Sequence, residues 1–205
     1  MEPEIIQQKA LELFSKHGTQ AVNMDCLARE LTISKKTLYK HFESKEALVY
    51  SLLEQVIEEW GASLDTILQG KKDPVSRLLA FELLRYDYLQ RFNPEFLVKK
   101  ATNYDSILDL QDIIKEQVSS IYYCLLEDAK DKGYLIECLD IHTFIKTHEM
   151  TFELFVEKCL SNTAQSHESF KHLVMLHTAG IVNQRKIDVW PVVEELLGNR
   201  NLVFQ

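Results

Sequence analysis

The chain has 205 residues, with 23 Lys and Arg against 31 Asp and Glu, so its formal net charge is −8, and 46% of its residues are hydrophobic. This composition excludes a disordered tail, which has far fewer apolar residues, and a disulfide-stapled secreted module, which is shorter and richer in cysteine. The 6 glycines and 4 prolines are too few for an all-β fold, whose turns depend on them. A mostly helical protein is therefore expected.

The cysteines are widely separated, form no C-x-x-C pair and follow no leading secretion signal: Cys26, Cys124, Cys138 and Cys159. This usage predicts reduced thiols in a cytoplasmic protein. Charged residues interrupt every apolar stretch, so no segment offers the roughly 20 uncharged residues of a membrane span. No membrane partner is expected.

The acidic total hides an uneven distribution of charge. The first 48 residues carry seven basic and seven acidic residues, so the whole excess of −8 belongs to the rest of the chain. Residues 29–45 alone have five basic residues against two acidic ones. Binding nucleic acid requires positive charge near the phosphates. Because residues 29–45 supply it locally, the acidic total does not exclude a nucleic-acid partner.

Three short helical patterns come first along the chain. Apolar residues at helical spacing predict a helix over 4–17, which Gly18 ends. A second helix follows Asn23, a favourable N-cap, and a third covers 35–42 after Ser34, another N-cap residue. Two short helices joined by a tight turn form a helix-turn-helix.

The third helix separates its apolar side chains from its polar ones. Leu38 and Phe42 share one face, while ammonium, phenol and hydroxyl groups project elsewhere and suit phosphates and base edges in a major groove. Helix N-termini at 34–36 and 45–47 add backbone N–H groups for phosphate. The alternative is a solvated basic face on a small bundle. The candidate DNA contacts are Ser34, Lys35, Lys36, Thr37, Tyr39, Lys40, His41 and Lys45.

The run LTISKKTLYKHFESKEAL, residues 31–48, closely resembles the DNA-binding signature of the TetR (tetracycline-repressor-like) family of bacterial transcriptional regulators. The resemblance is specific over residues 5–53. It implies that the third helix enters the major groove, where Lys36, Thr37, Tyr39 and His41 meet DNA. It also implies that Lys45 touches a phosphate.

Three positions depart from the family pattern. Thr32 stands at a turn position usually held by glycine, which indicates either a turn that needs no positive φ or mild strain. Lys36 replaces a frequent glycine in the recognition helix and adds a long donor. Cys26 stands where an acidic residue is common, so one interaction with the helix dipole is absent.

Residues 49–205 show no linker or repeat and read as one bundle of successive helices. We therefore predict an all-α chain with an N-terminal helix-turn-helix domain at 1–48 and a larger helical domain at 49–205. The family resemblance implies that the larger domain binds an effector and dimerises through its last two long helices. The expected helices are 45–69, 74–92, 94–101, 106–132, 140–161, 167–183 and 188–198.

Two polar residues lie inside apolar stripes of this larger domain. Glu82 falls within the stripe of 74–92 and His148 within that of 140–161. Such residues can orient a ligand in a pocket, or they can be paired within the core or at a dimer interface. Aromatic residues could line the same cavity, although at helical spacing they are also plain core. The candidate ligand residues are Glu82, Tyr86, Tyr122, His148 and Phe152.

The last two long helices carry apolar residues that could form a two-fold, four-helix interface. A dimer is expected because one short recognition helix reads few bases, whereas two reach half-sites about one turn apart. Packing within one chain is the alternative. The candidate interface residues are Phe155, Phe170, Leu173, Val174, His177 and Ile181.

No catalytic motif appears in the sequence. His148-Glu149 lacks the second histidine of a zinc-binding H-E-x-x-H helix, and His167 and His172 are five residues apart, about 140° around a helix. There is no G-x-S-x-G and no phosphate-binding glycine loop. We expect no enzyme, no metal and no cofactor.

These patterns together predict a homodimeric, sequence-specific DNA-binding transcriptional regulator. It is expected to be a repressor whose partners are a palindromic double-stranded operator and a small-molecule effector. The alternative is a helical protein-interaction module with a vestigial DNA-binding domain.

Overall fold

The computed structural model describes residues 2–91, 105–159 and 163–198. The chain divides into two compact units, residues 1–61 with 89–114, and residues 62–88 with 115–205. All regular elements in the described part are helices, and an isolated pairing of Leu135 with Val182 is the strand-like contact there. The all-α prediction is confirmed.

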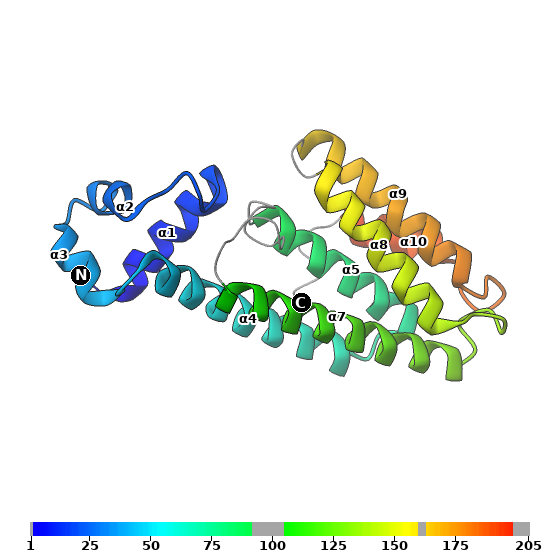
Figure 1. Cartoon of the computed structure of the whole chain (residues 1–205). Coiled ribbons are helices and arrows are strands. Elements are labelled where there is room, and N and C mark those ends of the chain that lie inside the picture. Colours follow the sequence, from blue (N-terminus) through cyan, green and yellow to red (C-terminus); the bar gives the residue numbers. More distant parts are fainter. Residues whose placement is uncertain (1, 92–104, 160–162, 199–205) are drawn as a thin grey trace. The chain divides into compact units, whose positions relative to one another are not determined.

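Unit 1 begins with α1 (Pro3–His17), α2 (Met24–Glu30) and α3 (Lys35–His41), followed by the first part of α4 (Lys45–Gln69) (Figure 1). Pro3 occupies the first turn of α1, where its missing N–H is not needed, and Gly18 ends the helix at φ 78°. The core of unit 1 consists of fully buried apolar side chains from all four helices: Ile6, Phe14, Leu27, Leu38, Leu48 and Leu52.

The start of α4 packs with the three short helices. Gln7 on α1 donates a hydrogen bond to Ser51 on α4 across 3.2 Å. The Ser44 hydroxyl caps α4 by accepting from the N–H of Ala47 at 3.0 Å. The predicted domain boundary after residue 48 therefore falls inside unit 1.

Unit 2 contains most of α5 (Pro74–Arg91), the second part of α7 (Asp105–Asp131), and α8 (Ile141–Cys159), α9 (Thr163–Ile181) and α10 (Val189–Gly198). These bounds agree with the predicted helices to within a few residues. The predicted short helix at 94–101 lies outside the described residues. The unit's core is made of large buried side chains: Val75, Phe81, Leu84, Tyr122, Leu126 and Phe170.

The connections at the ends of α7, α8 and α9 are held by backbone hydrogen bonds. Ile136 N–H donates to the Ile181 carbonyl at 2.9 Å, and Asn183 N–H donates to the Tyr134 carbonyl at 2.7 Å. Gly133 ends α7 at φ 72°, a conformation that glycine adopts without strain. These contacts fix the α7–α8 connection against the end of α9.

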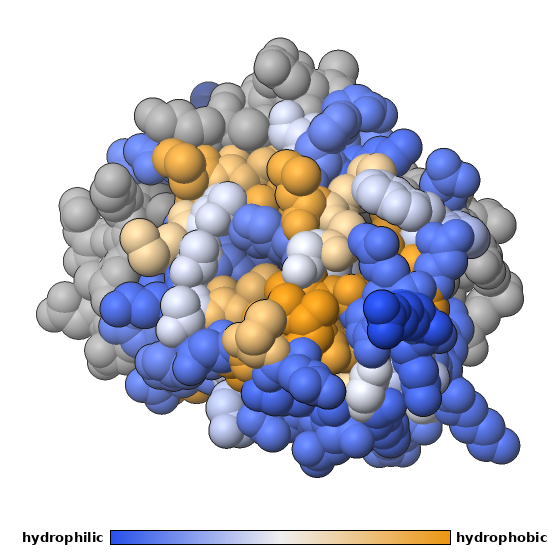
Figure 2. Space-filling view, turned by 90° about the vertical axis from the view of Figure 1, so that its right-hand side faces the viewer, coloured by the Kyte–Doolittle hydropathy of each residue, from blue (hydrophilic) through white to orange (hydrophobic). Residues whose placement is uncertain are grey.

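Apolar side chains are not confined to the two cores. Figure 2 shows a face on which apolar residues gather in the middle, with hydrophilic residues among them and below them. None of the helices in the described part is both long and apolar enough to cross a membrane.

Candidate functional site

The third helix of unit 1 has one buried and one exposed face. Leu38 is fully buried and Phe42 is 8% exposed, so both anchor α3 in the core. Ser34 caps the helix by accepting from the N–H of Thr37 at 3.0 Å, and the hydroxyls of these two residues are 2.8 Å apart. The cap leaves the rest of the polar face to solvent. The exposed side chains on this face are Lys35, Lys36, Tyr39, Lys40 and His41.

Two predicted DNA contacts already have partners within the chain. The Lys35 ammonium forms an ion pair with Asp25 of α2. The Lys45 ammonium donates a hydrogen bond to the backbone carbonyl of Thr19, and burial lowers the pKa of Lys45. Lys36 and Lys40 form no ion pair with another described residue, so their charges are the ones most available to a phosphate.

The turn before α3 contains a backbone conformation that disfavours its residue. Thr32 has φ 56°, and it is the one described non-glycine residue with a positive φ. A β-branched residue in this region is strained, so of the two readings of Thr32 the strained turn is the correct one. The N–H of Thr32 donates to Arg29 and that of Ile33 to Ala28, both at 3.0 Å, which holds the turn closed.

Unit 2 holds a buried polar cluster, which consists of Glu82, Arg85, Tyr122, His148, Glu149 and His177. Glu82 on α5 is 3% exposed, and its Oε1 accepts a hydrogen bond from the Tyr122 hydroxyl of α7. The same oxygen lies 2.8 Å from Nε2 of His148 on α8. The two polar residues predicted inside apolar stripes therefore face each other, and Tyr122 joins them.

Arg85 supplies the positive charge of the buried polar cluster. Its guanidinium donates to the Tyr122 hydroxyl and to Oε2 of Glu149, the latter at 3.2 Å. Its Nη1 also lies 2.9 Å from Oε1 of Glu149, and its Cζ lies 3.7 Å from the centroid of the Phe152 ring. This set of contacts neutralises a carboxylate that would otherwise be costly to bury.

Burial and charge act in opposite directions on the cluster's acids. Burial alone would raise the pKa of Glu82, but the charge and hydrogen bond of His148, followed by the charge of Arg85, lower it below the ordinary value. Glu82 is therefore an ionised acceptor. Burial raises the pKa of the Tyr122 hydroxyl well above its ordinary range, which keeps Tyr122 a donor.

The cluster ends at a contact between two histidines. Nδ1 of His148 lies 2.6 Å from Nδ1 of His177 on α9, and the ring centroids are 4.9 Å apart. His148 is 2% exposed, whereas His177 is half-buried. The cluster thus extends from α5 through α7 and α8 to α9.

Three of the five predicted ligand residues, Glu82, Tyr122 and His148, meet in the buried polar cluster, together with residues that were not predicted. Phe152 lies against Arg85, at the edge of the cluster, whereas Tyr86 stacks on Phe170 with centroids 4.1 Å apart. Arg85 and Glu149 were not predicted. The sequence contains a signal for both residues, because each is a charged residue close to an apolar stripe. Arg85 lies one helical turn after Glu82, and Glu149 directly follows His148.

The predicted dimer residues lie mostly inside one chain. Phe155, Phe170, Leu173, Val174 and Ile181 are each at most 8% exposed, and His177 contacts His148. They pack within unit 2 of the single chain, and their place in an interface between subunits stays a prediction. The apolar residues that α8 and α9 leave exposed are different ones: Met150 (63%), Leu154 (56%) and Leu176 (72%).

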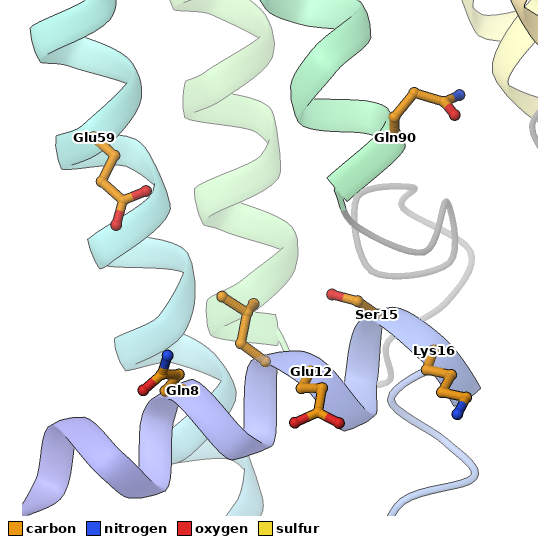
Figure 3. Close-up of a pocket in the computed structure, with 7 residues that line it drawn as sticks. Gln8, Glu12, Ser15, Lys16, Glu59 and Gln90 are labelled. Carbon is orange, nitrogen blue, oxygen red and sulfur yellow. The ribbon is translucent and has the colours of Figure 1, made fainter.

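A surface hollow of about 550 Å³ lies in unit 1 (Figure 3). Gln8, Glu12, Ser15 and Lys16 of α1 line it, together with Glu59 and Gln90. Its lining mixes charges of both signs, and it contains none of the predicted site residues. Within the described part, no group of three or more His, Cys, Asp or Glu side chains could hold a metal ion.

Residues 6–52 match the model of the bacterial regulatory proteins of the tetR family. The N-terminal part of the chain is thus similar to the tetR-family regulators. The resemblance read from the sequence is confirmed, and the match covers α1 to α3 and the start of α4, where the candidate nucleic-acid face lies.

Curated relatives extend this similarity beyond the matched domain. The nucleoid occlusion factor SlmA of Sodalis glossinidius is 30% identical over 119 residues, which are 58% of this chain and 59% of the relative. SlmA of Escherichia coli matches with the same identity and coverage. The chain therefore spans about three fifths of the length of these relatives.

Solved structures share the fold over most of the chain. A regulator from Saccharomonospora viridis, solved in complex with choline, has a TM-score of 0.75 at 16% identity and covers 88% of this chain and 97% of its own. The MbdR regulator of Azoarcus sp. CIB has a TM-score of 0.70 at 18% identity, covering 86% and 97%. These similarities show that the chain shares the fold of these two solved regulators over most of its length.

Proposed function

We propose that this chain is a sequence-specific DNA-binding transcription regulator, and that α3 is its recognition helix. The observation that carries the proposal is the exposed polar face of α3, held in place by buried Leu38 and capped by Ser34. The match of residues 6–52 to the tetR family supports it. Lys36, Tyr39, Lys40 and His41 are exposed on this face and would contact the DNA.

The experiment is a selection of genomic DNA fragments on the purified full chain, followed by a gel shift with each retained fragment. We expect at least one fragment to be retarded by the wild type and not by the double variant Lys36→Ala, Tyr39→Ala. The matched control is Lys71→Ala, which removes an exposed lysine outside the matched domain. If no fragment is retarded at low salt, the regulator proposal fails and the protein-interaction module takes its place.

The regulator would act as a homodimer through α8 and α9. These helices pack on each other, and each leaves large apolar side chains exposed, including Met150 and Leu154 four residues apart on α8. On α9, Leu176 is followed by Gly180, where a Cβ would meet nothing within 4 Å. A two-fold dimer would bury this surface twice and would place two recognition helices on successive half-sites.

A small molecule would regulate DNA binding from the buried polar cluster. Glu82 Oε2 is buried without a hydrogen-bond partner and lies 3.9 Å from Nη1 of Arg85. A ligand with a hydrogen-bond donor would satisfy this oxygen. The choline bound to the S. viridis regulator makes amines the first class to screen. The ligand would act by binding two conformations unequally, with a typical coupling of about 1–3 kcal/mol.

Thermal unfolding of the full chain with amines and with carboxylates as probes tests this effector. We expect an amine to raise the melting temperature of the wild type, since binding to the native state stabilises it. The increase should disappear in Glu82→Gln. An amine that stabilises both proteins equally would bind elsewhere and would contradict the assignment.

A further inference from the structure

The two Nδ1 atoms of His148 and His177 can share one proton in a hydrogen bond, but they cannot both carry a proton at this contact. Their Nδ1 atoms are 2.6 Å apart, which is hydrogen-bond distance, and the rings meet at 65°. A hydrogen bond at this distance requires one nitrogen to donate and the other to accept. If both nitrogens carried a proton, two N–H groups would point at each other, and the contact would be repulsive.

The other side of His148 fixes where its own proton lies. Nε2 of His148 is 2.8 Å from Oε1 of Glu82, a carboxylate that also lies near the Arg85 guanidinium and whose pKa is lowered below the ordinary value. An ionised carboxylate only accepts, so His148 must donate from Nε2. In its neutral form His148 then accepts at Nδ1, and His177 donates to it. The hydrogen bonds therefore run from His177 through His148 to Glu82.

The charges of the cluster distinguish the first added proton from the second. Glu82 and Glu149 are two carboxylates, and Arg85 is the one guanidinium that faces them, so the cluster has a net charge of −1 when both imidazoles are neutral. One proton on either imidazole brings this sum to zero and still leaves one donor and one acceptor at the Nδ1 contact. A second proton leaves a buried positive charge and two facing donors.

We propose that His148 and His177 form a proton-operated latch between α8 and α9, closed while the pair shares at most one added proton and opened by the second. Glu82 of α5 and Tyr122 of α7 contact His148 directly. Arg85 of α5 and Glu149 of α8 lie one contact further away, since Arg85 binds both Tyr122 and Glu149. The ring centroid of Phe144, stacked on His148, lies 5.7 Å away, and that of Phe152 lies 6.4 Å away, so aromatic rings flank His148. His177 is the half-buried member through which a proton from solvent would enter.

The pKa of His177 has the direction that the latch requires. Burial, and then the charge of His148, lower it below the ordinary value of 6.5. The unfolded chain therefore binds a proton at this residue at a higher pH than the folded chain does. Its contribution to stability is complete above about pH 6.5 and is lost as the pH falls below it.

The test is urea unfolding of the full chain at pH 7.5, 6.5 and 5.5, and it needs no DNA, so its outcome is independent of the proposed regulator function. His177→Asn keeps a hydrogen-bonding group near the Nδ1 position but does not titrate. His172→Asn is the matched control, because His172 is an exposed histidine on the same helix whose Nδ1 bonds the Glu168 carbonyl one turn earlier. As the pH falls below 6.5, the unfolding constant of the wild type should rise by up to about tenfold per pH unit for each proton that the folded chain excludes. The unfolding constant of His172→Asn should rise equally, and that of His177→Asn clearly less.

An unfolding constant of His177→Asn that rises as steeply as that of the wild type would overturn the latch. If His177→Asn does not fold, side-chain nitrogen NMR of the wild type replaces it. We then expect His177 to take up its proton below the ordinary pKa of 6.5, with loss of the Nδ1 contact at the same pH. Titration of His148 and His177 independently of each other would also overturn the proposal.

Discussion

The Lys35 ammonium and the Asp25 carboxylate form an ion pair that joins α3 to α2. The pair is exposed on both sides, with side chains 62% and 53% accessible, so it is weak. It nevertheless places a negative charge beside one of the predicted DNA contacts. Lys36, the next residue, has no such neighbour among the described residues and occupies a position where the family often has glycine.

We therefore expect Lys36→Ala to weaken DNA binding more than Lys35→Ala. Loss of one phosphate contact should reduce the slope of log affinity against log salt by about 0.9. Fluorescence anisotropy with a random-sequence duplex at several salt concentrations measures this slope without knowledge of the operator. Equal slopes for Lys36→Ala and the wild type would show that Lys36 does not contact phosphate.

Thr32→Gly should stabilise the protein. Thr32 is exposed at φ 56°, and such a conformation costs a non-glycine residue about 1–3 kcal/mol. Glycine relieves the strain but gains entropy in the unfolded chain, so we expect a net increase of about 1 kcal/mol in the free energy of unfolding. Urea unfolding measures it, with Thr32→Ala as control. Alanine keeps the Cβ and should give a smaller gain; an equal gain would mean that branching alone causes the strain.

The helices were predictable because their signals are local. Asn23 and Ser34 accept hydrogen bonds from the N–H groups of Cys26 and Thr37, as their positions before apolar periodic segments indicate. The turn at Thr32 was only partly predictable, since a sequence names the residue but not its φ. The structure shows that Thr32 has a positive φ, because the chain must turn between the end of α2 and the start of α3 at this residue.

The sequence predicts some members of the buried polar cluster but not the contacts between them. Periodicity places Glu82 and His148 within apolar stripes, but it cannot say which residue of another helix each one meets. Apolar side chains at helical spacing likewise look the same whether they pack inside a chain or between two chains. For this reason the sequence does not separate Phe170 and Val174, which are buried within the chain, from Leu176, which is exposed.

Tyr122→Phe should destabilise unit 2 by about 1–3 kcal/mol. The lost hydroxyl accepts from Arg85 and donates to Glu82, and both charged groups would stay buried with one hydrogen bond fewer. Tyr123→Phe is the matched control, because Tyr123 is 51% exposed and its change should stay within about 0.5 kcal/mol. Urea unfolding of both variants at pH 7.5 compares them. Equal small losses would show that the Tyr122 hydrogen bonds contribute little.

Leu176→Glu should dissociate the proposed dimer. Leu176 is 72% exposed, so the substitution costs the single chain little, but a two-fold interface would bring the new carboxylate in twice and remove it from water. We expect the dimer affinity to fall by more than tenfold, as measured by sedimentation over a range of concentrations. Ile113→Glu, at a 50% exposed apolar site on α7, should leave the dimer intact. If Ile113→Glu dissociates it and Leu176→Glu does not, the dimer forms through another face, and the exposed apolar residues of α8 and α9 serve a different contact.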